Sequence, residues 1–210
     1  MQIDPKDHSS AELYRLMIST VVPRPIAWVS THSEAGVVNV APFSYFQAIG
    51  SRPPLLMLSI GQRRYQGQRI DKDTLRNIRS QGEFVVNIVT EAHLDAVNHS
   101  AIDCPPEHSE VEELGLATAP SEVISVPRIA SCPVHYECVT HQILQLGDHG
   151  RMSVVIGEVV RFHVDPDLWD AESGTVDVRK LRPLARLGGK LYAGLGEIFE
   201  RDRPSWPTDE

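Results

Sequence analysis

Short runs of β-branched and aromatic residues recur along this chain, and Gly-, Pro- and Asp-containing turns separate most of them. The runs lie at 26–31, 37–46, 55–60, 83–89, 134–147 and 151–164, with a shorter one just before Cys132. The turn from Gly147 to Gly150 contains residues that tolerate the positive φ angles of a tight hairpin. Strands and helices do not alternate, which argues against a parallel sheet. The pattern predicts a mainly β barrel or sandwich with peripheral helices.

A few segments have helical spacing and are expected to lie outside the sheet. These helices are expected over 11–20, 74–82 and 91–103. Asp73 or Thr74 is expected to cap the second of them at its start, and Gly82 suits its carboxyl-terminal cap. Residues 61–71 are polar and contain Gly, so they are expected to form a loop that is long enough to carry function.

Charge and composition exclude several classes of protein. The 210 residues include 20 Lys and Arg against 28 Asp and Glu, a formal net charge of −8, and no basic stripe. Nucleic acid and anionic membrane are therefore not expected as partners. No basic flank precedes an apolar run at the start, and no window resembles a membrane span. We expect one domain over 1–200, a tail at 201–210 that is an arm or disordered, and a cytoplasmic protein with three reduced cysteines.

Several common catalytic and binding motifs are absent from the sequence. The Gly-rich stretch 188–196 lacks the G-x-G-x-x-G order and follows no strand, and no G-x-x-x-x-G-K-[ST] loop occurs. His135, Cys138 and His141 fall on alternating faces of an expected strand, so they are not expected to share a metal ion. No G-x-S-x-G nucleophile elbow occurs either. We therefore assign no metal site and no catalytic side chain.

Three segments together carry the groups of a phosphate site. Within 37–46, Pro42 interrupts the strand and Ser44 follows two residues later. Ser59 ends another apolar run. Lys72-Asp73-Thr74 opens a helix, whose amino terminus offers free N–H groups and a partial positive charge. Hydroxyl groups and a lysine would add further donors. Ordinary helix capping on a solvated face is the alternative interpretation of Lys72-Asp73-Thr74.

Six linked motifs follow one another along the chain. They are Pro23 to Thr31 (PRPIAWVST), Gly36-x-x-Asn39-x-Ala41-Pro42-Phe43-Ser44, Pro53-Pro54 with Leu58-Ser59-Ile60, Lys72-Asp73-Thr74-Leu75-x-Asn77-Ile78, Glu83-Phe84-Val85-Val86-Asn87 and Pro183-Leu184-x-Arg186-Leu187-Gly188-Gly189-x-x-Tyr192. In order, spacing and residue identity this set resembles the flavin reductase-like family of FMN-binding split barrels, which includes the flavoredoxins. The resemblance covers nearly the whole chain, although residues 104–180 share only the general strand pattern.

The resemblance implies a six-stranded Greek-key split barrel with helices at its ends, which works as a homodimer with FMN near the subunit interface. Carried over by position, the residues that hold the phosphate would be Ser44, Ser59, Lys72 and Thr74, with Asp73 beside them. Those along the ribityl chain and the isoalloxazine ring, mostly through backbone groups, would be Ala27, Trp28, Val29, Ser30, Asn39, Ala41, Pro42 and Phe43. Arg186, Gly189 and Tyr192 would close the flavin pocket.

The resemblance also implies an oxidoreductase, and it leaves three functions open. The chain could be an NAD(P)H-dependent flavin or ferric reductase that serves a partner oxygenase. It could instead reduce a small organic substrate such as a nitroaromatic over bound FMN, or act as a non-catalytic electron carrier for a redox protein. NAD(P)H would bind briefly in an open cleft over the flavin, without a general acid or base. The three arginines of 61–69 either recognise the second substrate or form a solvated face.

Overall fold

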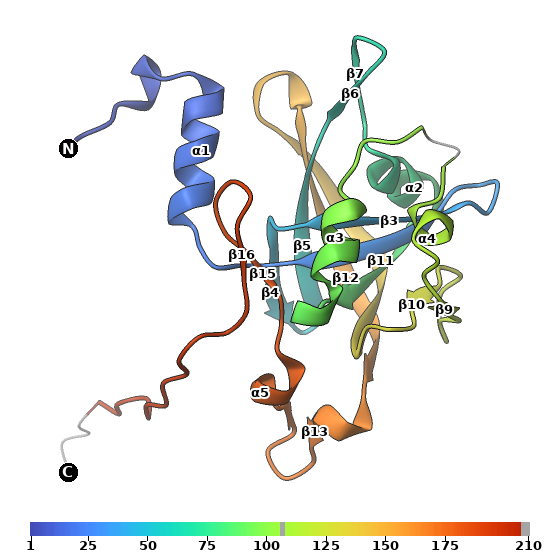
Figure 1. Cartoon of the computed structure of the whole chain (residues 1–210), viewed down its shortest axis with the longest axis vertical. Coiled ribbons are helices and arrows are strands. Elements are labelled where there is room, and N and C mark those ends of the chain that lie inside the picture. Colours follow the sequence, from blue (N-terminus) through green and yellow to red (C-terminus); the bar gives the residue numbers. More distant parts are fainter. Residues whose placement is uncertain (106–107, 207–210) are drawn as a thin grey trace.

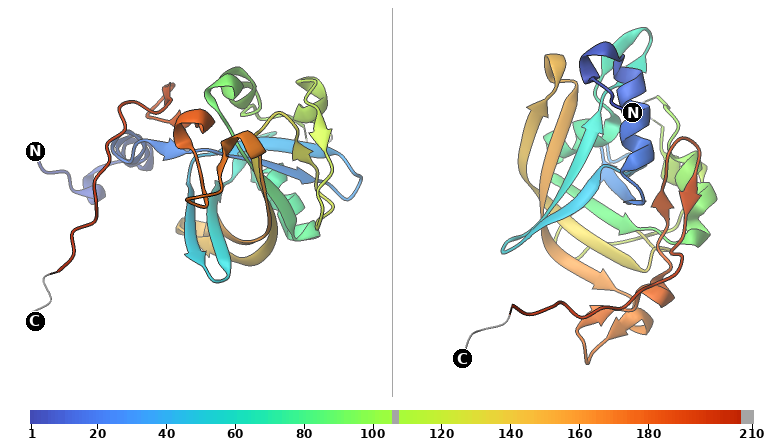
Figure 2. Two further views of the ribbon diagram at one scale, coloured as in Figure 1. Left: turned by 90° about the horizontal axis from the view of Figure 1, so that it is seen from below. Right: turned by 90° about the vertical axis from the view of Figure 1, so that its left-hand side faces the viewer.

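The computed structural model describes residues 1–105 and 108–206, and its centre is a seven-stranded antiparallel sheet (Figure 1). Its strands are β2 (Ala27–His32), β3 (Val38–Phe43), β4 (Phe46–Ser51), β5 (Pro54–Gly61), β8 (Glu83–Ile88), β11 (Val134–Leu146) and β12 (Met152–Val164), in the order β3-β2-β8-β11-β12-β5-β4. The two edge strands, β3 and β4, are consecutive in the chain, and only Ser44 and Tyr45 separate them. The sheet therefore curls so that its edges approach each other, as the left view of Figure 2 shows.

Short strands and helices surround this sheet. Three paired strands, β1 (Arg24–Pro25), β15 (Ala185–Arg186) and β16 (Tyr192–Ala193), join the two ends of the chain. Two-stranded ribbons are β6 (Arg63–Tyr65) with β7 (Gln68–Ile70), β9 (Thr118–Ala119) with β10 (Arg128–Ile129), and β13 (Trp169–Asp170) with β14 (Thr175–Val176). The helices are α1 (Ser10–Thr20), α2 (Asp73–Gln81), α3 (Leu94–His99), α4 (Glu110–Glu113) and α5 (Val178–Leu181), with single 3₁₀ turns η1 (Pro5–Asp7), η2 (Glu91–His93), η3 (Asp148–Gly150) and η4 (Pro166–Leu168).

The core follows the two-residue period of the strands. Along β2, Val29 points into the barrel and packs in one apolar cluster with Leu58 and Phe84, whereas Trp28 points outward into a second cluster beneath α3. Helix α2 contributes Leu75 to the inner cluster, so its position over the barrel is fixed by apolar packing. Both faces of β2 are therefore buried, and this explains its nearly continuous apolar sequence.

Several expectations about local structure are confirmed. Helix α1 spans Ser10–Thr20, and Ser9 with Glu12 forms a capping box at its start. Helix α2 ends at Gly82, whose φ of 74° is the left-handed conformation that favours Gly. The turn at Gly147 to Gly150 connects β11 and β12 as a hairpin. The two long strands, β11 and β12, form the longest antiparallel pair in the sheet.

Other local expectations are wrong. Neither Asp73 nor Thr74 caps α2: Lys72 holds the cap position, and its side chain makes no capping hydrogen bond. Residues 61–71 form the β6–β7 hairpin instead of a loop, because Gln66 and Gly67 adopt positive φ angles of 47° and 80°. The helix expected over 91–103 is only a 3₁₀ turn followed by α3, which ends at His99.

The number of strands also differs from the six that the resemblance implies. The chain continues beyond Pro42 and Ser44 into β4, which pairs with β5 across the Pro53–Pro54 turn and so adds a seventh strand. At the carboxyl terminus, residues 194–206 form no helix or strand, and 201–206 are exposed. Positions 207–210 of the expected tail, and residues 106–107, lie outside the described residues.

Candidate functional site

Three adjoining cavities form a trough that begins beside the edge strand β3. The first, of about 50 Å³, lies between β3 and the start of α2, and the second, of about 210 Å³, shares Pro42 and Ala101 with it. A third and more open cavity of about 530 Å³ shares Asn98, Arg186 and Tyr192 with the second. The three cavities therefore run from the amino terminus of α2 to the carboxyl-terminal ribbon β15–β16, and we call them the β3 trough.

Unpaired backbone groups lie at the α2 end of the trough. The first intrahelical hydrogen bond of α2 runs from Arg76 N to Lys72 O, at 3.1 Å. The N–H groups of Asp73, Thr74 and Leu75 precede that bond, so they lack intrahelical partners. Because the Lys72 side chain does not cap the helix either, the positive end of the helix dipole remains free for an anion.

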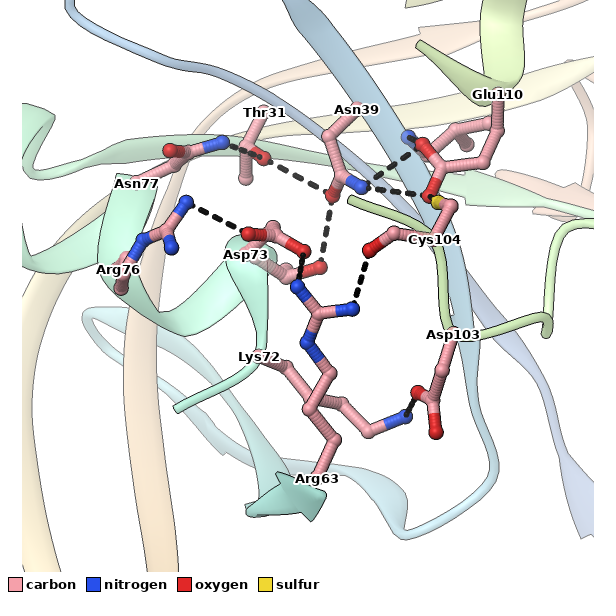
Figure 3. A network of polar contacts seen from close by, with 12 residues as sticks. Thr31, Asn39, Arg63, Lys72, Asp73, Arg76, Asn77, Asp103, Cys104 and Glu110 are labelled. Atoms are coloured by element: carbon pink, nitrogen blue, oxygen red, sulfur yellow. Dashed lines mark hydrogen bonds and ion pairs between the residues drawn. The ribbon is translucent and has the colours of Figure 1, made fainter. Parts of the chain in front are cut away.

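Arg63 is buried beside this helix terminus, with 5% of its surface exposed (Figure 3). Its guanidinium contacts Asp73 Oδ2 at 2.8 Å and donates to the carbonyl oxygen of Cys104. Arg76 also contacts Asp73, at 2.6 Å. Among the described residues, the Nε atom of Arg63 has no hydrogen-bond partner. Arg63 therefore brings an unused donor to the first cavity, which it helps to line.

A buried carboxylate orients the other polar side chains of this cavity. Both carboxylate oxygens of Glu110 accept from Asn39 Nδ2, at 3.0 and 2.8 Å, and Val40 N donates to the same group at 3.2 Å. The amide of Asn39 therefore turns its oxygen toward α2, where it accepts from Thr74 Oγ1 at 2.9 Å. The Thr74 hydroxyl is therefore committed to Asn39, and the link ties α2 to β3.

The thiol of Cys104 belongs to the same network. Its Sγ lies 3.0 Å from Glu110 Oε1, and only 8% of the residue is exposed. Burial, together with the hydrogen bond and negative charge of Glu110, raises the pKa of Cys104 to about 12. The thiol therefore stays protonated at neutral pH and cannot act as a nucleophile.

The second cavity has a mixed apolar and polar lining. Tyr14 of α1, Ile26, Pro42 and Val97 supply apolar surface, and Ser44 and Asn98 supply polar atoms. At its rim the guanidinium of Arg186 stacks on the ring of Tyr192, with 4.2 Å to the ring centroid. Tyr192 donates its hydroxyl proton to Asn98 at 3.2 Å, and Arg186 donates to the carbonyl of Gly189 at 2.6 Å. The ribbon at the carboxyl terminus thus closes one side of the cavity.

Arg24 ties the segments of this second cavity together. It is buried, with 5% of its surface exposed, and its Nε donates to Ser44 Oγ at 3.4 Å. Its terminal nitrogens donate to the carbonyls of Ile18, Val21 and Leu187, at 2.7, 2.7 and 2.8 Å. One side chain therefore connects the end of α1, the β3–β4 turn and the carboxyl-terminal ribbon.

The structure brings many of the expected cofactor residues together. Those that line the first two cavities are Asn39, Ala41, Pro42, Ser44, Lys72, Asp73, Thr74, Arg186 and Tyr192. Gly189 does not line either cavity, but its carbonyl positions Arg186. The expected phosphate residues are divided, because Ser44 lies in the second cavity whereas Lys72 and Thr74 lie in the first.

The remaining expected residues lie in the barrel wall and line none of the three cavities. They are Ala27, Trp28, Val29, Ser30, Phe43 and Ser59. The backbone of β2 pairs with β3 on one side and β8 on the other, and Trp28 donates its indole N–H to Ser100 at 2.8 Å. Ser59 lies within β5, between β12 and β4. Their contact with a cofactor, expected mostly through backbone groups, therefore stays a prediction.

Sequence reasoning missed several residues of the trough. The three arginines of 61–69 are expected to recognise a second substrate or to form a solvated face, and the second alternative is wrong for Arg63, which is buried at the first cavity beside Asp73. Glu110, Asp103 and Asn98 lie in segments whose pattern has no functional signal.

Within the described residues, no group of three or more His, Cys, Asp or Glu side chains is arranged to hold a metal ion. None of the described helices has the length and apolar character needed to cross a membrane.

Comparison with known proteins identifies the family. Residues 18–184 match the flavin reductase like domain. Nitrilotriacetate monooxygenase component B from Bacillus cereus has 38% identity and a TM-score of 0.88, with 95% of this chain and 98% of that chain covered. A 2-nitrobenzoate 2-nitroreductase from Pseudomonas fluorescens has 31% identity and a TM-score of 0.87, with 100% and 99% covered.

A more distant structure supports the expected fold class. A flavin reductase with a split barrel domain from Shewanella frigidimarina has 18% identity and a TM-score of 0.82, with 97% of this chain and 100% of that chain covered. The expectation of a split barrel, mainly β with peripheral helices, is therefore confirmed. Because the domain match spans most of the chain, this protein belongs to the flavin reductase-like family.

Proposed function

We propose that the chain is an FMN-binding oxidoreductase that takes hydride from NAD(P)H, and that the β3 trough holds the cofactor. The first cavity would take the phosphate, the second the isoalloxazine ring, and the third, more open cavity the nicotinamide nucleotide. The observation that carries this assignment is the buried Arg63, whose Nε lacks a partner among the described residues beside the uncapped start of α2. A phosphate oxygen is an acceptor that suits both groups.

The residues along the trough fit the rest of the cofactor. Ala41 and Pro42 offer a flat apolar edge strand between the two ends, and Ser44 offers a hydroxyl in the second cavity. When bound, FMN would supply the hydride chemistry, because no side chain of the protein can accept a hydride. The chain's own groups would hold and orient it. Arg186 at the rim would attract an anionic nucleotide, since its charge faces both the second and the third cavity.

Within this activity, we favour a flavin reductase that serves a partner oxygenase. The similarity to a monooxygenase component B supports this choice, since it covers nearly all of both chains at 38% identity. The second candidate is the reduction of a small nitroaromatic over bound FMN, which the similarity to a 2-nitrobenzoate 2-nitroreductase supports at 31% identity. The third cavity would admit the second substrate in either case.

A homodimer is part of the proposal. Helix α1 buries none of its residues, and Tyr14, Leu16 and Met17 are exposed by 57%, 40% and 56%. In both Figures 1 and 2 this helix extends away from the barrel. A second copy that covers α1 would bury this apolar surface next to the second cavity, which Tyr14 lines. Sedimentation should then give about twice 23.4 kDa, and a monomer that retains FMN would contradict the dimer.

The decisive experiment is the visible absorbance spectrum of the protein with FMN, followed by anaerobic addition of NADH and then NADPH. We expect flavin bands that bleach with at least one nucleotide. Bands that persist with both would favour an electron carrier that receives electrons from another protein. No flavin binding at all would contradict the cofactor assignment.

We also propose a cytoplasmic location, because all three cysteines are free and buried and a reducing compartment keeps them so.

A further inference from the structure

The first cavity contains more acidic than basic side chains. Arg63 and Lys72 supply its positive charge, and Asp73, Asp103 and Glu110 supply its negative charge. Each cation already has an acidic partner: Arg63 contacts Asp73 at 2.8 Å, and Lys72 Nζ lies 3.8 Å from Asp103 Oδ1 (Figure 3). A phosphate dianion would therefore enter a site that carries no excess of positive charge.

The acidic groups are not equivalent. Glu110 is buried and orients Asn39, and Asp73, with 12% of its side chain exposed, holds Arg63 and Arg76. Asp103 is different, because 53% of its side chain is exposed and Lys72 is its partner in an ion pair. An exposed pair of this kind contributes little to stability, so stability does not account for a carboxylate at this position.

We propose that Asp103 lowers the preference of the trough for FMN over riboflavin. Its carboxylate pairs with Lys72 and repels the phosphate, so the two flavins bind with similar affinity. This inference rests on the proposed function, because it needs the phosphate in the first cavity. The ring end of the trough then supplies most of the affinity, and the backbone N–H groups of α2 orient the phosphate without binding it tightly. A flavin held in this way leaves readily, as a reductase that delivers reduced flavin to another protein requires.

The test measures the dissociation constants of FMN and riboflavin for the wild type and for Asp103→Asn by quenching of flavin fluorescence. Removal of one negative charge near a dianion should tighten FMN binding about three- to tenfold and change riboflavin binding less than about twofold. The gain for FMN should shrink in about 0.5 M NaCl, because salt screens exposed charges. Asp148→Asn, in the exposed turn between β11 and β12, removes the same charge far from the trough and should change neither constant.

The outcomes separate this inference from the cofactor assignment. If the wild type binds neither flavin, the proposed function fails. If it binds FMN but Asp103→Asn leaves the ratio of the two constants unchanged, or weakens FMN binding, the role of Asp103 is refuted while the flavin site stands. A wild type that already binds FMN more than about a hundredfold more tightly than riboflavin would refute it as well, since that ratio means about 2.7 kcal/mol from the phosphate.

Discussion

The two ends of the β3 trough are built differently. At the α2 end, Asn39, Thr74 and Glu110 are buried and bonded to one another, and all come from elements packed on the barrel. At the other end, α1 and the β15–β16 ribbon form part of the wall, and Arg24 connects both of them. The α2 end is therefore preformed by the core, whereas the other end depends on terminal segments with little buried surface of their own.

The substitution with the largest expected effect on the α2 end of the trough is at Asn39. In Asn39→Ala the Glu110 carboxylate loses its amide donor, and Thr74 loses its acceptor, both in buried positions. We expect a loss of about 3 kcal/mol in the free energy of unfolding, together with weaker FMN binding. Chemical denaturation measures the first effect and fluorescence titration the second. For stability alone, Asn98→Ala is the matched control at the other end of the trough, where the lost bond to Tyr192 should cost less than about 1 kcal/mol. Equal losses in the free energy of unfolding for Asn39→Ala and Asn98→Ala would contradict the proposed difference between the two ends of the trough.

A second variant tests the tie at the other end. Arg24→Ala removes the donors to the carbonyls of Ile18, Val21 and Leu187. We expect a smaller loss of global stability, about 2 kcal/mol, and a selective loosening of α1. Limited proteolysis should show faster cleavage within 9–22 while the barrel stays resistant. Arg64→Ala, on the exposed side of the β6–β7 hairpin, should leave the cleavage pattern unchanged. If Arg24→Ala also left it unchanged, this arginine would not be the link.

Acid should affect the barrel in a way that the terminal segments do not share. Burial lowers the pKa of His135 to about 4, helped by the charge of Arg128, while His135 Nε2 donates to Ile129 O at 2.9 Å. The unfolded chain binds a proton on this residue near pH 6.5. Between about pH 6.5 and 4 the unfolded state therefore holds more protons, and stability falls as the pH falls, by at most about 1.4 kcal/mol per pH unit.

Denaturation curves across this range should show a shallower pH dependence for His135→Gln than for the wild type. His108 provides the control, because the hydrogen bond that its Nε2 donates to Glu113 raises the pKa of this exposed imidazole. The contribution of His108 is complete below its unfolded pKa and is lost as the pH rises through the raised value, so its sign is opposite. If His135→Gln and His108→Gln changed the curves in the same sense, the assignment of His135 as a buried neutral group would be wrong.

Most of the β architecture could be predicted from the sequence, because strand and turn signals are local. Runs such as 134–147 and 151–164 form β11 and β12, and the helical spacing over 11–20 predicts α1. The seventh strand was missed, because Phe46–Ser51 mixes polar and apolar residues and is mostly exposed. The β6–β7 hairpin was missed because its turn uses a positive φ at Gln66, where Gly or Asn is the usual signal.

The candidate site divides in the same way. By itself the sequence determined the motifs of β3 and of Lys72-Asp73-Thr74, since their backbone geometry is specified by residues close in the chain. Only the tertiary structure decided that Arg63, Asp103 and Glu110 complete the first cavity, and that Trp28 and its neighbours in β2 are buried in the wall. The physical reason is that burial and charge pairing depend on contacts across long sequence separations, such as Asn39 with Glu110, and no local pattern encodes which distant partner a side chain meets.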